Sequence, residues 1–177
     1  MRRLVIATLL FASSTALAQA PQKAAPAYDP EARLLFPTDY REWIYLSSDF
    51  DLSYAEGLPP NTHIFGNVFV DRDAYAAFQK TKAWPDRTML LLELRPAGGD
   101  NPLNKRGQYQ AGPPAAIEMH VKDASKGGWG FYAFDNAHAP AQLLPRSASC
   151  YACHEQHAAT DTTFTQFYPT LAEAAVK

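Results

Sequence analysis

The 177-residue sequence has little of what nucleic-acid binding, membrane spanning or a disulfide framework requires. It holds only two cysteines, so cross-links cannot be the main source of its stability. Sixteen Lys and Arg nearly balance eighteen Asp and Glu, and no basic run exceeds two residues, which excludes a nucleic-acid footprint. Fourteen prolines and nine tyrosines argue against a coiled coil or helical bundle. The length suits one globular domain.

The N-terminus has the layout of a secretory signal peptide. Two arginines, Arg2 and Arg3, precede an uncharged apolar run at 4–12, and Ala16-Leu17-Ala18 is a small-x-small cleavage site. The run is well short of the ~20 residues of a transmembrane anchor, the alternative interpretation, and no second run of spanning length follows. We therefore expect a signal peptide at 1–18 that is cleaved to give a periplasmic protein without a membrane span. In the mature protein we expect a flexible leader at 19–36, followed by one domain at 37–177.

The two cysteines stand in the sequence Cys150-Tyr151-Ala152-Cys153-His154. C-x-x-C-H is the attachment signature of a c-type haem. Two thiols three residues apart on a helix can each form a thioether to one porphyrin, and the next residue, His154, is then placed to ligate the iron. We therefore expect one covalent haem c, held by Cys150 and Cys153, with His154 as the metal ligand.

Three other interpretations of the motif are weaker. A thioredoxin-like dithiol would follow the first strand of a βαβ unit, and no such unit surrounds this motif. A zinc site needs further Cys or His ligands, and only His157 lies nearby. A disulfide between Cys150 and Cys153 would close too small a loop to restrict the unfolded chain much.

Hydrophobic periodicity predicts an α+β fold, a mostly antiparallel sheet with flanking helices and a C-terminal haem-binding helix. Alternating or β-branched and aromatic segments predict strands at 41–46, 63–70, 88–94, 116–121 and 129–134. Helices are expected at 74–81 after an N-cap at 71–73, over the haem motif from 149, and at 170–176.

The terminal block resembles the cytochrome P460 family. It reads Cys-x-x-Cys-His-x-x-x-Ala-x-x-Asp-x-x-Phe-x-x-Phe-Tyr-Pro-x-Leu from Cys150 to Leu171, and the segments 39–43, 67–71 and 129–132 are also similar to that family. The resemblance implies a periplasmic homodimer in which the sheet forms one wall of the haem pocket. It further implies a pentacoordinate haem with His154 proximal and an open distal face.

The family's hydroxylamine-oxidising members carry a lysine on a central strand that bonds to the porphyrin edge, and here the matching position is Leu92. The nearest lysines, Lys80, Lys82 and Lys105, lie off that strand. Those relatives also place a carboxylate just before the haem motif, where this chain has 147–149, Ser-Ala-Ser. Both departures favour the cytochrome c′-β branch, which binds nitric oxide in an apolar distal pocket.

Two apolar residues are candidates for that distal pocket, Phe65 and Leu92, although aromatic and leucine side chains on strands are often simply core. Met89, Met119 and His120 are alternative sixth ligands. The main hypothesis is therefore a small-ligand-binding, electron-exchanging haem protein. The alternatives are an oxidoreductase acting on hydroxylamine and a six-coordinate electron-transfer cytochrome. The sequence names no catalytic residue and no redox partner.

Overall fold

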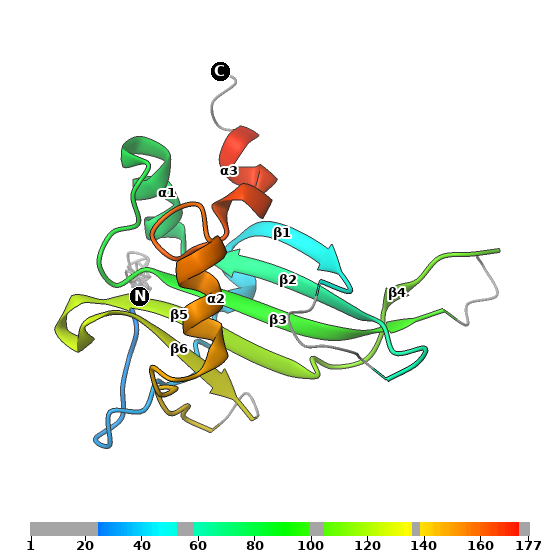
Figure 1. Cartoon of the computed structure of the whole chain (residues 1–177), viewed down its shortest axis with the longest axis horizontal. Helices are drawn as coiled ribbons and strands as arrows, with labels where there is room; N and C mark the ends of the chain where they lie inside the picture. Colours follow the sequence, from blue (N-terminus) through cyan, green and yellow to red (C-terminus); the bar gives the residue numbers. More distant parts are fainter. Residues whose placement is uncertain (1–24, 53–58, 100–104, 136–138, 174–177) are drawn as a thin grey trace, which may run out of the picture.

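The computed structural model describes residues 25–52, 59–99, 105–135 and 139–173. The expected signal peptide and the start of the leader lie outside these ranges. The described chain forms a six-stranded antiparallel sheet with three α-helices, which confirms the α+β class (Figure 1). The strand order is β1-β2-β3-β5-β6, with β4 paired to β3. The strands are β1 (Ile44–Phe50), β2 (Ile64–Val70), β3 (Met89–Gly98), β4 (Tyr109–Gln110), β5 (Ala116–Asp123) and β6 (Gly128–Phe134).

The helices are α1 (Arg72–Thr81), α2 (Ser149–His157) and α3 (Pro169–Glu173), with short 3-10 turns η1 (Tyr40–Glu42), η2 (Ala124–Lys126) and η3 (Thr165–Phe167). The predicted N-cap of α1 is present: the Asp71 carboxylate accepts a bond from the Ala74 amide at 2.8 Å. The same carboxylate accepts from the Met89 amide at 2.9 Å, which ties the start of the helix to β3. None of the described helices is long and apolar enough to cross a bilayer.

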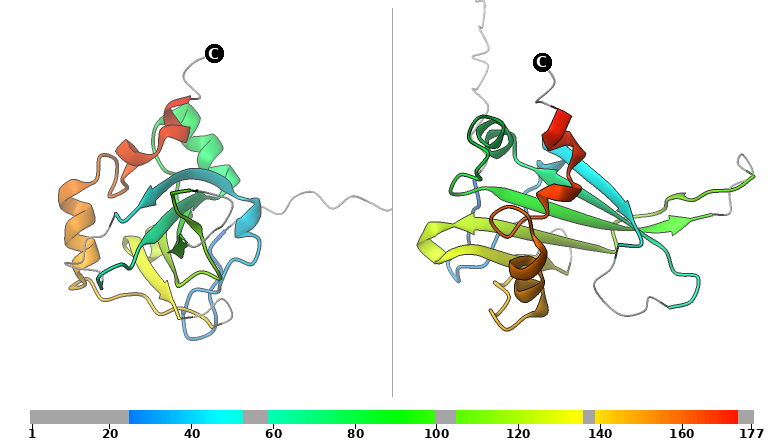
Figure 2. Two further views of the ribbon diagram at one scale, coloured as in Figure 1. Left: turned by 90° about the vertical axis from the view of Figure 1, so that its right-hand side faces the viewer. Right: turned by 45° about the horizontal axis from the view of Figure 1, so that its top comes forward.

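The sheet separates two apolar clusters. The cluster on the face covered by α1, α2 and α3 comprises Leu46, Val70, Ala74, Phe78, Trp84, Leu90, Trp129 and Leu171. The opposite face carries Leu34, Tyr40, Trp43, Met89, Leu91, Ile117, Met119, Val121, Tyr132, Phe134 and Ala141. Figure 2 shows the helices and the N-terminal segment on opposite sides of the sheet. We call the first side the helix face.

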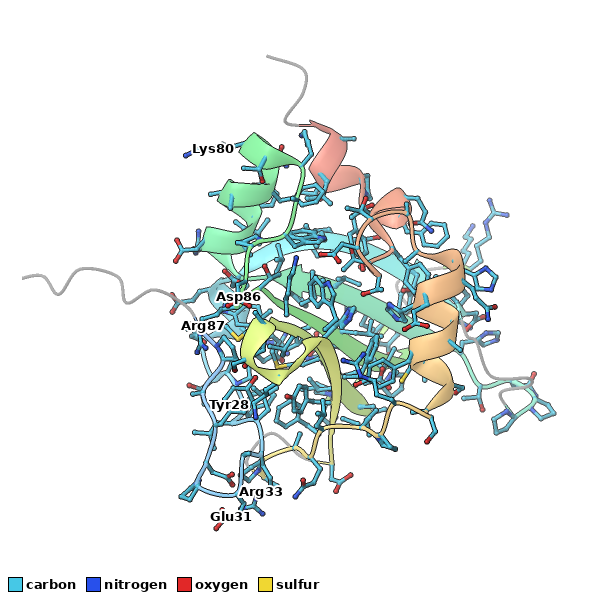
Figure 3. The ribbon with its side chains drawn as sticks, turned by 60° about the vertical axis from the view of Figure 1, so that its left-hand side comes forward. Tyr28, Glu31, Arg33, Lys80, Asp86 and Arg87 are labelled. Atoms are coloured by element: carbon cyan, nitrogen blue, oxygen red, sulfur yellow. The ribbon has the colours of Figure 1, made fainter. Side chains whose placement is uncertain are left out.

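The expectation of a flexible leader up to residue 36 is wrong for residues 25–36. Leu34 is fully buried in the second cluster, and its backbone pairs with Ala141 in both directions at 2.9 Å. The Tyr28 hydroxyl donates to Asp123 at 2.9 Å. Figure 3 shows Tyr28 and Arg33 in this segment beside the sheet. This segment is rich in Ala and Pro, so its composition did not predict that a few apolar side chains pack against one face of the core.

Two local expectations also change. The strand expected at 41–46 starts later, because residues 40–42 form the turn η1 and β1 begins only at Ile44. The two-residue strand β4 was not expected at all, since so short a segment has no measurable periodicity.

Candidate functional site

Helix α2 carries the C-x-x-C-H motif and packs on β6. The Tyr151 hydroxyl accepts a bond from the Phe131 amide at 3.2 Å and lies 3.3 Å from the Leu144 carbonyl, to which it donates. The Tyr151 ring meets Phe131 edge-on at 4.7 Å. Cys150 and Cys153 are free thiols, partly exposed and three residues apart on the helix. Tyr151 thus points into the core, and the two thiols remain accessible.

One ring nitrogen of His154 already takes part in a hydrogen bond. Its Nδ1 lies 2.7 Å from the Thr162 carbonyl, which can only accept, so Nδ1 carries the proton and Nε2 keeps a free lone pair. The ring packs against Phe164 at 4.3 Å and Phe131 at 4.6 Å. Burial lowers the pKa of His154, partly opposed by the bond to Thr162. The imidazole is therefore held neutral and oriented, as a metal ligand must be.

A strip of the helix face beside α2 is left uncovered. The register aligns four cross-strand partners on this face: Val68, Leu92, Glu118 and Ala133. All four are partly or fully exposed, whereas the preceding row of Val70, Leu90, His120 and Phe131 is buried. Leu94 and Ala116, on the same face beyond Leu92, are also partly exposed. We call this set, Val68, Leu92, Leu94, Ala116, Glu118 and Ala133, the open strip.

These features fit a c-type haem. The thiols are unpaired, one imidazole nitrogen is free, and a mostly apolar strip lies beside them, which a porphyrin ring would cover. A zinc site is not supported, because no three His, Cys, Asp or Glu side chains gather within the described ranges.

Glu118 is a candidate that sequence reasoning missed. Its side chain is accessible, yet the surrounding protein desolvates the carboxylate enough to raise its pKa. Burial raises the pKa of the Cys150 thiol, and the charge of Glu118 raises it further, which places the carboxylate near the motif. Among the described residues, Glu118 has no hydrogen-bond or ion-pair partner. Period-two alternation with His120 was the signal that could have found it.

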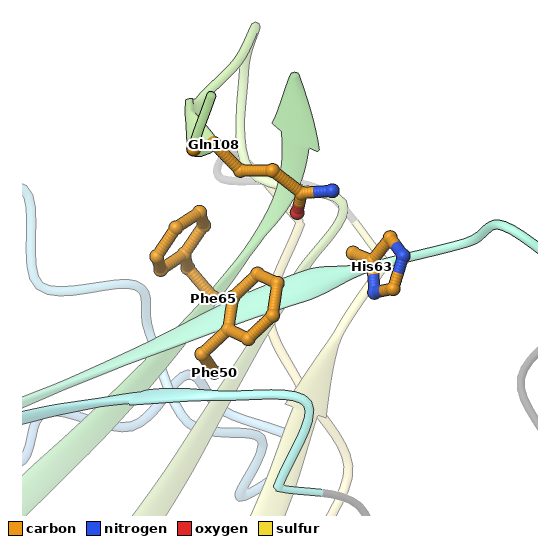
Figure 4. Close-up of a pocket in the computed structure, with 5 residues that line it drawn as sticks. Phe50, His63, Phe65 and Gln108 are labelled. Carbon is orange, nitrogen blue, oxygen red and sulfur yellow. The ribbon is translucent and has the colours of Figure 1, made fainter. Parts of the chain in front are cut away.

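The placement of Phe65 at the distal face is wrong. Phe65 pairs with Arg95, whereas Leu92 pairs with Val68, so Phe65 and Leu92 point to opposite faces of the sheet. Leu92 lies on the helix face with the motif. Phe65 instead lines an open hollow of about 340 Å³ on the other side, whose further walls are Phe50, His63, Gly107 and Gln108 (Figure 4).

The alternative sixth ligands are also placed. Met89 and Met119 are buried in the cluster on the far face, so neither thioether reaches the helix face. His120 lies on the helix face, but its ring already contacts His154 edge-on with centroids 5.1 Å apart. His120 is therefore a side-by-side neighbour of His154 in this structure.

None of the lysines discussed as cross-linking candidates belongs to the open strip. Lys80 is exposed on α1 and points away from the sheet in Figure 3. Lys82 and Lys105 are exposed as well, in connections outside the strands. Strand β3 itself contains no lysine.

The comparisons with known proteins agree with this geometry. The family model described as Cytochrome P460 matches residues 37–165, which include the sheet and the C-x-x-C-H helix. A comparison with curated proteins returns no match. Because the family model covers most of the chain, this protein belongs to the cytochrome P460 family.

Proposed function

We propose that this protein is a c-type cytochrome that binds a small ligand such as nitric oxide at a pentacoordinate haem and exchanges electrons through it. Membership of the cytochrome P460 family implies haem c as the cofactor. The motif residues Cys150, Cys153 and His154 would hold it, and a haem supplies an iron that can bind diatomic ligands and change oxidation state.

The open strip carries this proposal. Five of its six members are apolar and provide no hydrogen-bond donor for bound dioxygen or peroxide, whereas nitric oxide needs none. Neither buried methionine reaches this face, and His120 is already in contact with the His154 ring, which supports an open sixth position. Leu92 at the centre of the strip supports the cytochrome c′-β branch, because a leucine cannot form the lysine cross-link.

The test is the optical spectrum of the parent protein and two histidine variants. We expect a high-spin ferrous spectrum, converted to a nitrosyl form by nitric oxide. His154→Ala should abolish the parent spin state, because the axial imidazole is lost. His157→Ala is the matched control, since its exposed side chain has no hydrogen-bond partner among the described residues, and only its backbone carbonyl accepts a bond, from Gln166 at 2.8 Å. A low-spin parent spectrum would contradict the proposal.

Glu118 favours a second candidate, oxidation of hydroxylamine. That oxidation releases protons, and Glu118 is the carboxylate on the open strip that would accept them; burial raises its pKa, which makes it a stronger base than a fully solvated glutamate. The support is the position of Glu118 on the face that carries the motif, two residues along β5 from His120.

Steady-state oxidation of hydroxylamine with an artificial electron acceptor separates the two candidates. If the second is right, Glu118→Gln should lower turnover by about 10²–10⁴-fold, as removal of a general base does. Glu155→Gln, an exposed carboxylate on α2, is the control and should leave turnover unchanged. Absence of turnover in the parent protein, together with nitric oxide binding, would leave the first proposal standing.

We also propose that the protein is exported to the periplasm and that it forms a homodimer. The basic n-region, apolar run and Ala16-Leu17-Ala18 site support a periplasmic protein. The family resemblance supports a homodimer. N-terminal sequencing of the secreted protein and its sedimentation behaviour test the two points separately.

A further inference from the structure

The loop that accepts the His154 hydrogen bond has an unusual backbone. Asp161 and Thr162 both lie in the left-handed region, with φ of 48° and 57°. Such a conformation is tolerated by Asp but is an outlier for a β-branched residue such as Thr162. The Thr162 hydroxyl is also buried without a hydrogen-bond partner. The strained residue is the one whose carbonyl lies 2.7 Å from His154 Nδ1.

Strain of this kind persists only where surrounding contacts hold it in place. The turn closes on itself through bonds between the backbones of Thr160 and Thr163, the shorter at 2.8 Å. From outside the turn, the buried indole N–H of Trp84 donates to the Thr163 hydroxyl at 2.8 Å. These contacts fix the C-terminal side of the turn to the loop between α1 and β3.

A second anchor reaches Asp161 itself. Lys122, on β5 two residues beyond His120, places its Nζ 2.6 Å from Asp161 Oδ2 and 2.9 Å from the Trp84 carbonyl. The ammonium also lies 5.8 Å from the Trp129 ring. The Lys122 side chain is 27% exposed and that of Asp161 41%, and the ammonium has two oxygen partners, whereas an isolated surface pair has one. One cation thus links the sheet, the α1–β3 loop and the strained turn.

We propose that the Lys122–Asp161 ion pair positions the proximal histidine: it holds the Asp161–Thr162 backbone so that the Thr162 carbonyl accepts from His154 Nδ1. Lys122 and Asp161 are therefore positioning residues that act through Thr162. The inference rests on the proposed haem ligation by His154. A partner on the second ring nitrogen increases the basicity of a ligating imidazole. A loosened turn would weaken that bond and favour the ferrous over the ferric state.

The experiment uses the holoprotein after intact mass has verified that haem is attached in each variant. Asp161→Asn keeps a residue that tolerates the left-handed conformation but removes the charge, and Lys122→Met removes the cation. Lys122→Arg restores the charge. Lys126→Met is the matched control, because Lys126 lies four residues further along, at the end of η2, but contacts the Tyr28 ring at 4.2 Å.

We expect Asp161→Asn and Lys122→Met each to lower the ferric-to-ferrous ratio, at a fixed applied potential, by about two- to tenfold. This is less than the 10–100-fold losses typical of removing a direct partner of a ligand. The double variant should shift no further than either single variant, because both remove the same contact. The iron–imidazole stretching frequency should fall in parallel, and amide exchange of Thr163 should accelerate. Lys122→Arg and Lys126→Met should resemble the parent.

Haem-loaded Asp161→Asn and Lys122→Met proteins with the parent's potential and stretching frequency would overturn the inference. So would additive shifts in the double variant, since these would mean that the two residues act separately. A parent protein without thioether-linked haem, or without an iron–imidazole stretch, would instead refute the proposed function.

Discussion

At the scale of single residues, the proposed chemistry of the open strip depends on Leu92. It pairs with Val68 on one side and Glu118 on the other, at the centre of the strip. An apolar side chain here can contact a porphyrin but cannot bond to it. The neighbouring carboxylate is then the one ionisable group among the six residues of the strip.

The first prediction concerns this leucine. Intact mass should correspond to polypeptide plus one haem with two thioether additions, and digestion should yield no haem-linked peptide from residues 88–95. Leu92→Lys should place an amine on the face of the sheet that carries the motif, so that peroxide treatment of the variant can produce a cross-link. A haem-linked peptide containing Lys80, Lys82 or Lys105 in the unmodified protein would contradict the assignment of Leu92.

Glu93, the residue after Leu92, faces the opposite side and is almost fully buried. Burial alone would raise its pKa, but bonds from Arg95 at 2.7 Å and Arg41 at 3.1 Å outweigh that effect and lower it. Tyr40 is the third residue that donates to this carboxylate, through its hydroxyl at 3.2 Å. The carboxylate is therefore stabilised in its charged form by a cluster that has no role in the open strip.

The second prediction follows from that pKa. A carboxyl whose folded pKa is depressed contributes stability above its unfolded pKa, about 4.5, and loses it as the pH falls through the folded value. Glu93→Gln should cost about 2 kcal/mol at pH 7, because bonds from charged donors are weakened or lost. The loss should shrink as the pH falls below about 4. Urea unfolding across pH 3–7 measures it, and the exposed Glu42→Gln is the control.

At the scale of elements, period-two and helical patterns located most of the fold but not how the strands pair. The strands at 64–70, 116–123 and 128–134 and the helices α1 and α2 agree with the patterns within a few residues. The pattern places Phe65 and Phe69 on one face of their strand, but only the observed register shows that Leu92 lies on the other. That register depends on loops and packing, which have no periodic signature.

The site was predictable to the extent that it depends on side-chain identity. The spacing of Cys150, Cys153 and His154 places all three on one short helix, as observed. The Thr162 carbonyl was not predictable, because every residue has a carbonyl and its role here arises from two left-handed residues in succession. The N-terminal segment was missed because its few apolar side chains, among them the buried Leu34, follow no helical or period-two pattern.

The third prediction tests that segment as a structural element. Leu34→Ala should destabilise the protein by about 2–5 kcal/mol, because it leaves a cavity at a fully buried position. Its neighbour provides the control: Leu35 is 40% exposed, and Leu35→Ala should change stability by no more than about 0.5 kcal/mol. Equal effects of the two substitutions in urea denaturation would mean that residues 25–36 do not close the core in solution.

At the scale of the whole molecule, haem binding should affect stability, because a bound haem would cover the apolar side chains of the open strip. The helix face is buried where α1, α3 and the motif helix cover it, and it is accessible only beyond His120 and Phe131. A bound porphyrin would extend that cover over Leu92 and Ala133. The protein without haem should therefore fold around the two observed clusters but expose an apolar surface that the holoprotein hides.

The last prediction separates attachment from folding. Replacing both Cys150 and Cys153 by Ser removes the thioethers, so acid–acetone extraction should release all haem, whereas each single variant should retain it through one bond. Burial of one leucine is worth about 1.5–3 kcal/mol, and 1 kcal/mol shifts Tm by about 2–4 °C for a chain of this size. The extracted double variant should thus melt about 3–12 °C below the holoprotein and bind more of a hydrophobic dye. Haem that resists extraction from the double variant would show that the C-x-x-C-H thiols are not its attachment points. An unchanged Tm after full extraction would show that the open strip is not where the haem lies.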